Sequence, residues 1–449
     1  MPTDGIGGPA DGPGAAVGAA AELRARVLDV DLAEPVPDVG AVVAGRPAYD
    51  SAWLVVRLFG EPLGLRVVDL PPGGLAAAQL EPLLAGGFGR AVADRVGPPG
   101  SACSPAEALA LARRAPGTAF SRAHAAFLAA APPISVVVCT RDNPVELRRC
   151  LASLAAQDHP DLDVVVVDNA PATPLTREVV EQAGSSLRVR YVPEPRPGLS
   201  RARNAALRQP FPGEVICWID DDEEADPMWA AEVGRAFAER PDAWSASGVV
   251  VPAELETTAQ VWFEEFGGHS KGRGFVPDEF GPATRARQSP LFPQPPFGVG
   301  ANMAFRVQAL RDLGGFDEAL GAGTRTGGAE DTKVFTQVLR AGGTSLYRPT
   351  ALTRHHHRRS VAALRRQMYG YGSGLTAFYT SLVLDRPATA APLARLSGRA
   401  LREVLSADSD RHATLGPRFP PDLLAANRRG LLAGPGLYLR QRVANRRER

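Results

Sequence analysis

The sequence predicts an α/β fold with a doubly wound, mostly parallel sheet, a small N-terminal α+β domain and C-terminal helices. From Ile134 onward, apolar strands of the buried type, such as ISVVVCT and DVVVVDNA, alternate with helical stretches. This alternation is typical of parallel βαβ units. Before it, β-branched runs such as ARVLDVDL and AWLVVRLF precede one helical stretch, and beyond residue 360 the chain is helical and rich in arginine.

Length and composition exclude several classes of protein. The 449 residues are 45% hydrophobic and 22% charged, with 50 Lys and Arg against 49 Asp and Glu. This composition is globular, and the balanced charge argues against a nucleic-acid-binding protein. The 4 cysteines have no CxxC spacing, so they predict no disulfide framework. The sequence contains no apolar run of ~18 residues and no secretory signal pattern, so we expect a cytoplasmic protein.

Changes in composition divide the chain into five segments. Residues 1–20 are mostly Gly, Ala and Pro, which predicts a disordered tail. We expect a small α+β accessory domain over 21–97, where GEPLGLRVVDL forms a hairpin with the strand before it, and a helical connector over 98–132. The wound domain follows over 133–359. A helical, Arg-rich extension occupies 360–449.

Carboxylates follow the ends of two buried strands. Asp220, Asp221 and Asp222 come directly after the strand at 215–219, and Asp168 ends the strand DVVVVD. The carboxyl ends of strands in a wound sheet meet at one edge, where ligands bind. We therefore predict a magnesium or manganese site shared with substrate phosphates, with Asp168 bonded to a ribose hydroxyl or a base. An acidic, solvated turn is the alternative interpretation of the triplet.

A second acidic pair opens a helix. In GGAEDTKVFTQVLRAGG, Glu330 and Asp331 follow two glycines. One interpretation is a carboxylate pair that caps the helix. The other is a general base, held near a pocket, that takes a proton from an attacking hydroxyl.

Three consecutive histidines follow a short strand in YRPTALTRHHHRR. Alternation along a strand places His355 and His357 on one side and His356 on the other. One imidazole would complete the metal shell begun by the carboxylates, and the arginines on either side would meet diphosphate charge. A His-rich surface loop is the alternative.

Two further segments contain glycine next to polar residues. EPRPGLSRARNAAL places Arg201, Arg203 and Asn204 in the first turns of a helix. FGVGANMAFR places Gly300 and Asn302 in a loop where glycine lets the backbone approach a ligand closely. Turns chosen for packing are the alternative for both segments.

Taken in order, these motifs resemble the family-2 glycosyltransferases of the GT-A fold, here with an actinobacterial-type N-terminal extension. The resemblance rests on SVVVCTRDN, VVVVDNAP, PGLSRARNAAL, WIDDDEEAD and GGAEDTKVF, followed by a histidine after YRPTALTR. It implies an inverting transfer of one sugar from a nucleotide-diphosphate sugar to an acceptor hydroxyl, assisted by Mn or Mg. The QxxRW motif of processive synthases is absent.

The resemblance also implies roles for individual residues. Asp222 matches a metal ligand, Asp220 the carboxylate nearer the ribose, and Asp331 the catalytic base. His355 best fits the family's histidine, with His356 and His357 as alternatives. The full set of expected site residues is catalytic Asp331 and Glu330; donor-binding Thr140, Arg141, Asp168, Arg201, Asn204, Asp220 and Asp221; metal-binding Asp222 and His355; and, in an acceptor or sugar loop, Gly300 and Asn302.

The sequence leaves two other functions open: a non-catalytic nucleotide-sugar-binding module, and a metal-dependent phosphohydrolase or nucleotidyltransferase. The expected partners are a nucleotide-diphosphate sugar and an acceptor that is a glycan, a lipid-linked molecule or a small molecule. The Arg-rich C-terminus, with its interleaved leucines, is interpreted first as a packing helix with a basic tail. Peripheral contact with the inner face of the plasma membrane is the alternative.

Overall fold

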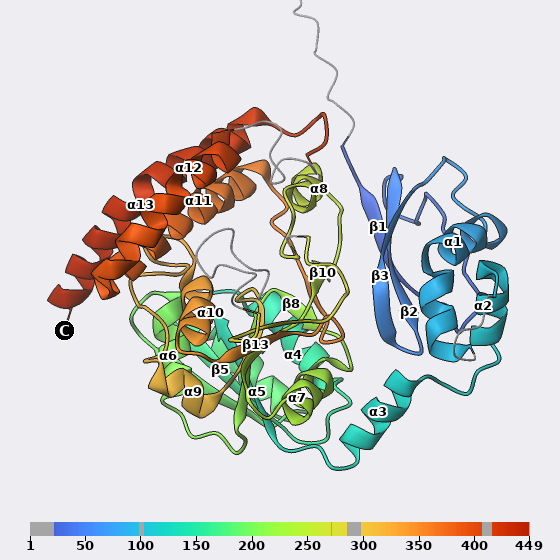
Figure 1. Ribbon diagram of the computed structural model, residues 1–449, viewed down its shortest axis with the longest axis horizontal. Coiled ribbons are helices and arrows are strands. Elements are labelled where there is room, and N and C mark those ends of the chain that lie inside the picture. Colours follow the sequence, from blue (N-terminus) through green and yellow to red (C-terminus); the bar gives the residue numbers. More distant parts are fainter. Residues whose placement is uncertain (1–21, 98–102, 271, 285–297, 406–414, 449) are drawn as a thin grey trace, which may run out of the picture.

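Three parts of the chain follow one another along the sequence in Figure 1: an N-terminal α+β unit, a central α/β domain, and long C-terminal helices along the opposite side. The computed structural model describes residues 22–97, 103–270, 272–284, 298–405 and 415–448. The tail expected over 1–20 lies outside the described residues.

An eight-stranded sheet forms the centre of the α/β domain. Its strands, in spatial order, are β11 (Asp278–Phe280), β13 (Thr344–Tyr347), β9 (Ala243–Ser247), β12 (Asn302–Arg306), β7 (Val215–Asp220), β4 (Ile134–Thr140), β5 (Leu162–Asn169) and β6 (Val189–Glu194). Only β11 and β12 run against the other strands. Every residue of β4 and β5 is buried, because parallel strands are covered on both faces. The predicted mostly parallel sheet is confirmed.

Helices cover both faces of this sheet. Side chains alternate along a strand, so Val137 of β4 belongs to one apolar core and Val136 and Val138 belong to the other. The helices of the first core are α6 (Leu199–Leu207), α9 (Val307–Asp312) and α10 (Glu330–Arg340). The helices of the second core are α4 (Pro144–Ala155), α5 (Leu175–Ala183) and α7 (Trp229–Glu239). Two cores on opposite faces are what a doubly wound fold requires.

A small second sheet lies beside the end of β7. Its strands are β10 (Val250–Pro252), β14 (Thr353–His355) and β8 (Glu223–Ala225), with β14 in the middle. β14 pairs antiparallel with β8, which places His355 opposite Glu223. The histidine run is thereby brought next to the aspartate triplet.

The N-terminal unit contains three strands and two packed helices. β2 (Ser51–Leu58) pairs in parallel with β1 (Ala25–Asp31) and antiparallel with β3 (Glu61–Asp69). Phe59 and Gly60 connect β2 to β3 with positive φ angles of 50° and 81°, which is the geometry of a two-residue hairpin turn. The strands pack against α1 (Ala77–Val96).

Two helices lie in the segment expected to be a connector. α2 (Pro105–Ala112) contributes Ala108 and Leu109 to the core of the N-terminal unit, so this part of the connector packs like part of that unit. α3 (Ala119–Leu128) lies against the α/β domain, where His124 bonds to Asp158 at 2.7 Å and to Glu232 of α7 at 2.8 Å.

Charged side chains join the N-terminal unit to the small sheet. Arg57 of β2 pairs with Asp29 of β1 and with Asp226, which follows β8. Arg354 of β14 pairs with Asp29 at 2.7 Å. The N-terminal unit therefore contacts the small sheet, whose strand β14 carries His355.

The C-terminal part contains α11 (Val361–Asp385), a short 3-10 turn (Pro387–Thr389), α12 (Ala390–Leu405) and α13 (Pro421–Arg447). Figure 1 shows α11 and α13 side by side, with α8 (Thr258–Glu265) near the start of α11. Phe263 of α8 shares an apolar cluster with Leu364 and Met368 of α11. Within the described ranges, none of the helices is both long and apolar enough to span a bilayer.

Candidate functional site

The carboxyl ends of three neighbouring strands form one edge of the site. Thr140 ends β4 and pairs in register with Asp168 of β5, and Cys139 pairs with Asp220 at the end of β7. Asp168 is fully buried and accepts a hydrogen bond of 2.8 Å from the Tyr191 hydroxyl. Burial raises the pKa of Asp168. The predicted gathering of these polar residues at one edge of the sheet is present.

Asp221 lies among other carboxylates with little solvent. Its Oδ2 accepts a hydrogen bond of 2.5 Å from the Thr140 hydroxyl. Burial, reinforced by the negative charges of Asp222 and Asp220, raises the pKa of Asp221 to about 7. Like charges held together in a partly desolvated place are relieved when a cation binds between them.

Asp222 faces two positively charged or chargeable groups. His355 Nε2 lies 3.3 Å from its Oδ1, and Arg358 Nη2 lies 3.4 Å from its Oδ2. Burial acts to raise the pKa of Asp222, but the charges of His355 and Arg358 outweigh it and hold that pKa well below its usual range. Asp222 is therefore a carboxylate that stays charged when buried, as a metal ligand must.

The second nitrogen of His355 is held by a chain of hydrogen bonds. His355 Nδ1 and His357 Nδ1 are 2.7 Å apart, and His357 Nε2 is 2.7 Å from Oε1 of Glu264. A carboxylate only accepts, so His357 Nε2 donates to Glu264 and His357 Nδ1 accepts from His355 Nδ1–H. This leaves Nε2 as the nitrogen of His355 that faces Asp222, where it donates to the carboxylate and would bind a metal once it gives up its proton.

The three histidines are thus distinguished by their contacts. His356 turns to the other side and bonds to Glu224 at 2.6 Å, as strand alternation predicts. His269, His355 and His357 offer ring nitrogens that lie within 4.8 Å of one another. His355 is the member of this group that also faces the aspartate triplet.

Arg203 connects the aspartate triplet to the Glu–Asp pair. This side chain is only 1% exposed. Its guanidinium donates to Glu330 Oε1 at 2.6 Å, to Asp220 Oδ1 at 3.4 Å and to the Gly300 carbonyl at 3.0 Å. Burial raises the pKa of Glu330 to about 7, although the charge of Arg203 opposes this. The carboxylates of Asp220 and Glu330 therefore share the guanidinium of Arg203 as their positively charged partner.

Asp331 is held by backbone donors at the start of α10. Its Oδ2 accepts from the Gly300 N–H at 2.7 Å, and its Oδ1 accepts from the Thr332 N–H at 2.6 Å. A Cβ at position 300 would lie 3.0 Å from Arg203 Nη2 and 3.2 Å from the Asp331 side chain. Glycine at this position lets the loop carry both contacts.

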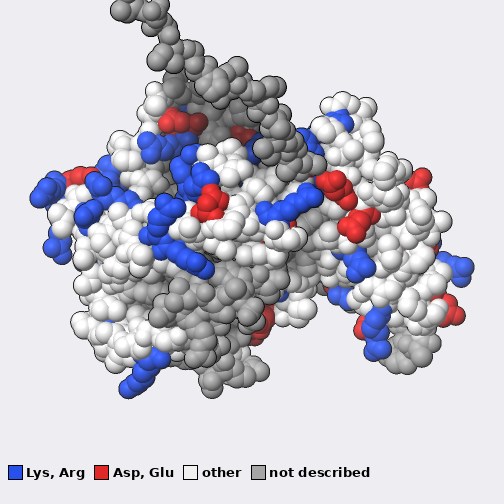
Figure 2. All heavy atoms as spheres, turned by 90° about the horizontal axis from the view of Figure 1, so that it is seen from above, with Lys and Arg blue, Asp and Glu red and all other residues white. Residues whose placement is uncertain are grey.

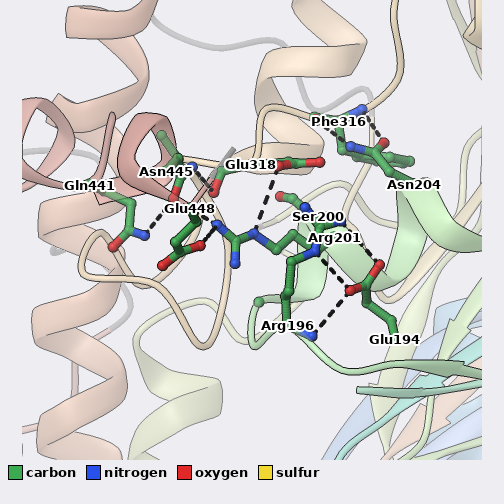
Figure 3. A network of polar contacts seen from close by, with 12 residues as sticks. Glu194, Arg196, Ser200, Arg201, Asn204, Phe316, Glu318, Gln441, Asn445 and Glu448 are labelled. Atoms are coloured by element: carbon green, nitrogen blue, oxygen red, sulfur yellow. Dashed lines mark hydrogen bonds and ion pairs between the residues drawn. The ribbon is translucent and has the colours of Figure 1, made fainter. Parts of the chain in front are cut away.

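The side chains of three expected site residues, Arg201, Asn204 and Asn302, are engaged in contacts with other parts of the chain. The Arg201 side chain contacts Asn445 (2.9 Å), Glu448 and Glu318, as Figure 3 shows. Asn204 exchanges two hydrogen bonds of 2.8 Å with the backbone of Phe316. These contacts tie α6 to neighbouring segments.

Asn302 is similarly occupied. Its side chain accepts from the Trp229 indole at 3.0 Å and donates to the carbonyls of Val249 and Ala351 at 3.1 and 2.8 Å. It therefore ties β12 to its surroundings. Arg141, by contrast, is exposed just beyond Thr140.

Arg203 was absent from the set of site residues expected from the sequence. A signal for it exists in α6, because Leu199, Arg203 and Leu207 recur every four residues and so share one helix face. Leu199 and Leu207 pack into the apolar core. A charged residue in such an apolar stripe requires a buried partner.

Comparison with known proteins shows the family of this chain. The model of the family described as Glycosyl transferase family 2 matches residues 135–314. Succinoglycan biosynthesis protein ExoM of Rhizobium meliloti (strain 1021) is 30% identical over 250 residues, which cover 53% of this chain and 72% of that protein. The chain belongs to glycosyl transferase family 2. The family resemblance predicted from the motifs is confirmed.

For another relative, a smaller share of its own length is matched. Pre-mycofactocin glycosyltransferase of Mycobacterium tuberculosis (strain ATCC 25618 / H37Rv) is 27% identical over 272 residues, which cover 60% of this chain and 51% of that protein. The chain thus spans about half the length of this relative.

Two solved structures resemble the chain at low identity. One is mannosyltransferase PcManGT from Pyrobaculum calidifontis in complex with GDP-Man and Mn2+, with a TM-score of 0.42, 20% identity and coverage of 71% of this chain and 75% of that one. The other is S. aureus TarS 1-349, with a TM-score of 0.40, 16% identity and coverage of 71% and 92%.

Proposed function

We propose that this family-2 protein transfers a single sugar from a nucleotide-diphosphate sugar to an acceptor hydroxyl, with inversion at the anomeric carbon. The observation that carries the proposal is the buried guanidinium of Arg203, which contacts both Asp220 of the triplet and Glu330 of the Glu–Asp pair. Donor-binding and proton-accepting groups would then lie around one reaction centre.

The side chains available as metal ligands fit a divalent cation, Mn or Mg. Asp222 supplies a buried, charged oxygen, and the hydrogen-bond chain from Glu264 holds His355 so that Nε2 faces Asp222 and would bind the ion after losing its proton. These two residues would hold the ion, which when bound would offset negative charge on the departing diphosphate. The crowding of Asp221 among like charges also favours a cation at this edge.

The nucleoside would lie over the carboxyl ends of β4 and β5. Thr140 and Asp168 are adjacent in register there, and Arg141 is exposed beside them. Asp220 and Asp221 would face the ribose and diphosphate. The side chains of Arg201, Asn204 and Asn302 are engaged in other contacts, so we do not include them in the donor site.

Asp331 would act as the general base. Gly300 N–H and Thr332 N–H fix its carboxylate. It would accept the proton of the acceptor hydroxyl while that oxygen forms a bond to the anomeric carbon and the bond to the diphosphate oxygen breaks. The nucleoside diphosphate leaves with the electron pair of that bond, and one displacement from the opposite face inverts the configuration.

A substitution at Asp331 tests this proposal. The donor base is first identified by thermal shift with a panel of nucleoside diphosphates, with and without Mn2+. In Asp331→Asn, the turnover of the corresponding sugar donor should fall by about 10²–10⁴-fold, since a positioned base contributes about that much, while the donor still raises the unfolding temperature. Asp312→Asn, an exposed aspartate on α9, is the matched control and should leave turnover unchanged.

Product analysis separates the alternatives. Sugar transfer releases an intact nucleoside diphosphate. Cleavage within the diphosphate would instead indicate a phosphohydrolase or nucleotidyltransferase, and donor binding without release of product would indicate a binding module. Near-normal turnover in Asp331→Asn would place the base elsewhere.

A further inference from the structure

The inner face of α13 is used for packing. A Cβ at Gly430 would lie 2.2 Å from the Tyr369 carbonyl, and one at Gly434 would lie 2.1 Å from the Thr376 hydroxyl. Asn427 on the same face donates to the Met368 carbonyl at 2.8 Å. The helix backbones of α11 and α13 therefore touch closely, and this face of α13 is unavailable to any other partner.

The outer face of α13 carries an exposed apolar stripe. Leu432 is 85% exposed, and Leu439 and Val443 are each 49% exposed. They are spaced by seven and four residues, so at about 100° per residue they lie along one line of the helix. Among the residues that the structure describes, these three large apolar side chains form an exposed line, which we call the α13 stripe.

Arginines flank the α13 stripe on both sides. By helix angle, one row contains Arg428, Arg442 and Arg446 and the other contains Arg429, Arg440 and Arg447. Each lies within about 80° of the stripe. Five of the six are exposed and Arg442 is partly so. Within residues 415–448 and the rest of the described chain, none of them forms an ion pair with a carboxylate.

Many other arginines of the protein are neutralised by acidic neighbours. Arg365 pairs with Asp422 at the start of α13, and Arg359 pairs with Glu254. Figure 2 shows Lys and Arg side chains gathered on the side of the molecule that carries the C-terminal helices. The net charge of the chain is only +1, so this positive surface is local.

We propose that the outer face of α13 lies on an anionic lipid bilayer. Leu432, Leu439 and Val443 would enter the boundary between headgroups and acyl chains, because an amphipathic helix buries its apolar side there. The arginines on either side would extend along that boundary and place their guanidinium groups at lipid phosphates. An apolar line between two cationic rows matches this layered surface in both polarity and charge.

Vesicle cosedimentation of the full chain tests the proposal. The protein should bind vesicles of phosphatidylglycerol and phosphatidylcholine, bind phosphatidylcholine alone at least ~10-fold more weakly, and bind the anionic vesicles less tightly as salt rises. Leu432→Ser/Leu439→Ser/Val443→Ser should weaken anionic-vesicle binding at least ~10-fold. Arg429→Gln/Arg440→Gln/Arg447→Gln should weaken it by on the order of 100-fold.

A matched control lies on another helix. Leu83→Ser/Arg90→Gln changes an exposed leucine and an exposed arginine on α1, and it should leave vesicle binding unchanged. Circular dichroism and the unfolding temperature confirm that each variant is folded. Absence of binding to anionic vesicles, or binding unaffected by the apolar substitutions, would overturn the proposal. If only the arginine variant lost binding, and bound RNA less tightly as well, the surface would be a polyanion site instead.

Discussion

The two ring nitrogens of His355 have different partners, and this difference defines the proposed metal site. Nε2 faces Asp222 and Nδ1 faces His357, which in turn bonds to Glu264. His357 therefore acts through His355, as a positioning residue. Its ring also packs edge-on against Phe263, with centroids 4.7 Å apart, so an aromatic substitute fits the same space.

We predict that His357→Phe weakens Mn2+ binding by about 10–100-fold, the usual effect of losing a hydrogen bond behind a metal ligand. The variant loses the acceptor for His355 Nδ1–H but keeps the ring volume. Isothermal titration with Mn2+ alone measures the effect without any turnover assay. His356→Phe is the matched control, because His356 bonds to Glu224 on the other side. Equal affinities in the two variants would contradict the assignment.

At the scale of elements, α11 and α13 are held together by glycines. Gly430 lies against the Tyr369 carbonyl and Gly434 against Thr376. Pro435 lies inside α13 and cannot donate to the Leu431 carbonyl, and the Thr376 hydroxyl of α11 donates to that carbonyl at 2.8 Å. The same crossing thus compensates for the proline.

Gly430→Ala should destabilise the protein by about 1–3 kcal/mol, the usual cost of forcing a group into a filled space. Gly436→Ala is the control in the same helix, because no atom lies within 4 Å of its added Cβ, and it should gain about 0.5–1 kcal/mol of stability from lower chain entropy. Urea unfolding measures both, with hydrogen exchange in α11 and α13 locating the effect. If Gly430→Ala left the free energy of unfolding unchanged, the two helices would be able to move apart at this crossing without cost.

The elements were predictable from the sequence wherever one local pattern determined them. The continuous apolar runs of β4 and β5 specify buried parallel strands, and the position of the triplet after β7 specifies its edge of the sheet. The choice among the three histidines depends on the pairing of β14 with β8, which no local pattern contains. Arg201 and Arg203 look equivalent in RARN, yet their partners, Glu448 and Glu330, lie in distant segments.

At the scale of the whole molecule, the N-terminal unit contacts the small sheet β10–β14–β8, whose middle strand carries His355. Arg57 and Asp226 form a buried ion pair, and Asp29 links Arg57 to Arg354 of β14. Ion pairs therefore join the N-terminal unit to the small sheet, with one acidic and one basic residue contributed by each part. A change at this junction should affect stability first.

We predict that Arg57→Met destabilises the protein by about 3–5 kcal/mol, because it leaves the buried carboxylate of Asp226 without its main partner. Urea unfolding at neutral pH measures the loss. Arg90→Met changes an arginine of the same unit that is 89% exposed, and it should alter stability by less than ~0.5 kcal/mol. Combining Arg57→Met with Asp226→Asn should recover part of the loss; no recovery would show that the pair does not couple.

The middle strand of the small sheet also sets an order of events during protein synthesis. β8 and β10 leave the ribosome early, whereas β14, which lies between them, is made much later. Until it emerges, the nascent chain carries the aspartates without the imidazole that faces them, and β8 and β10 have no strand between them. The proposed ion-binding corner can therefore form only after β14 has emerged.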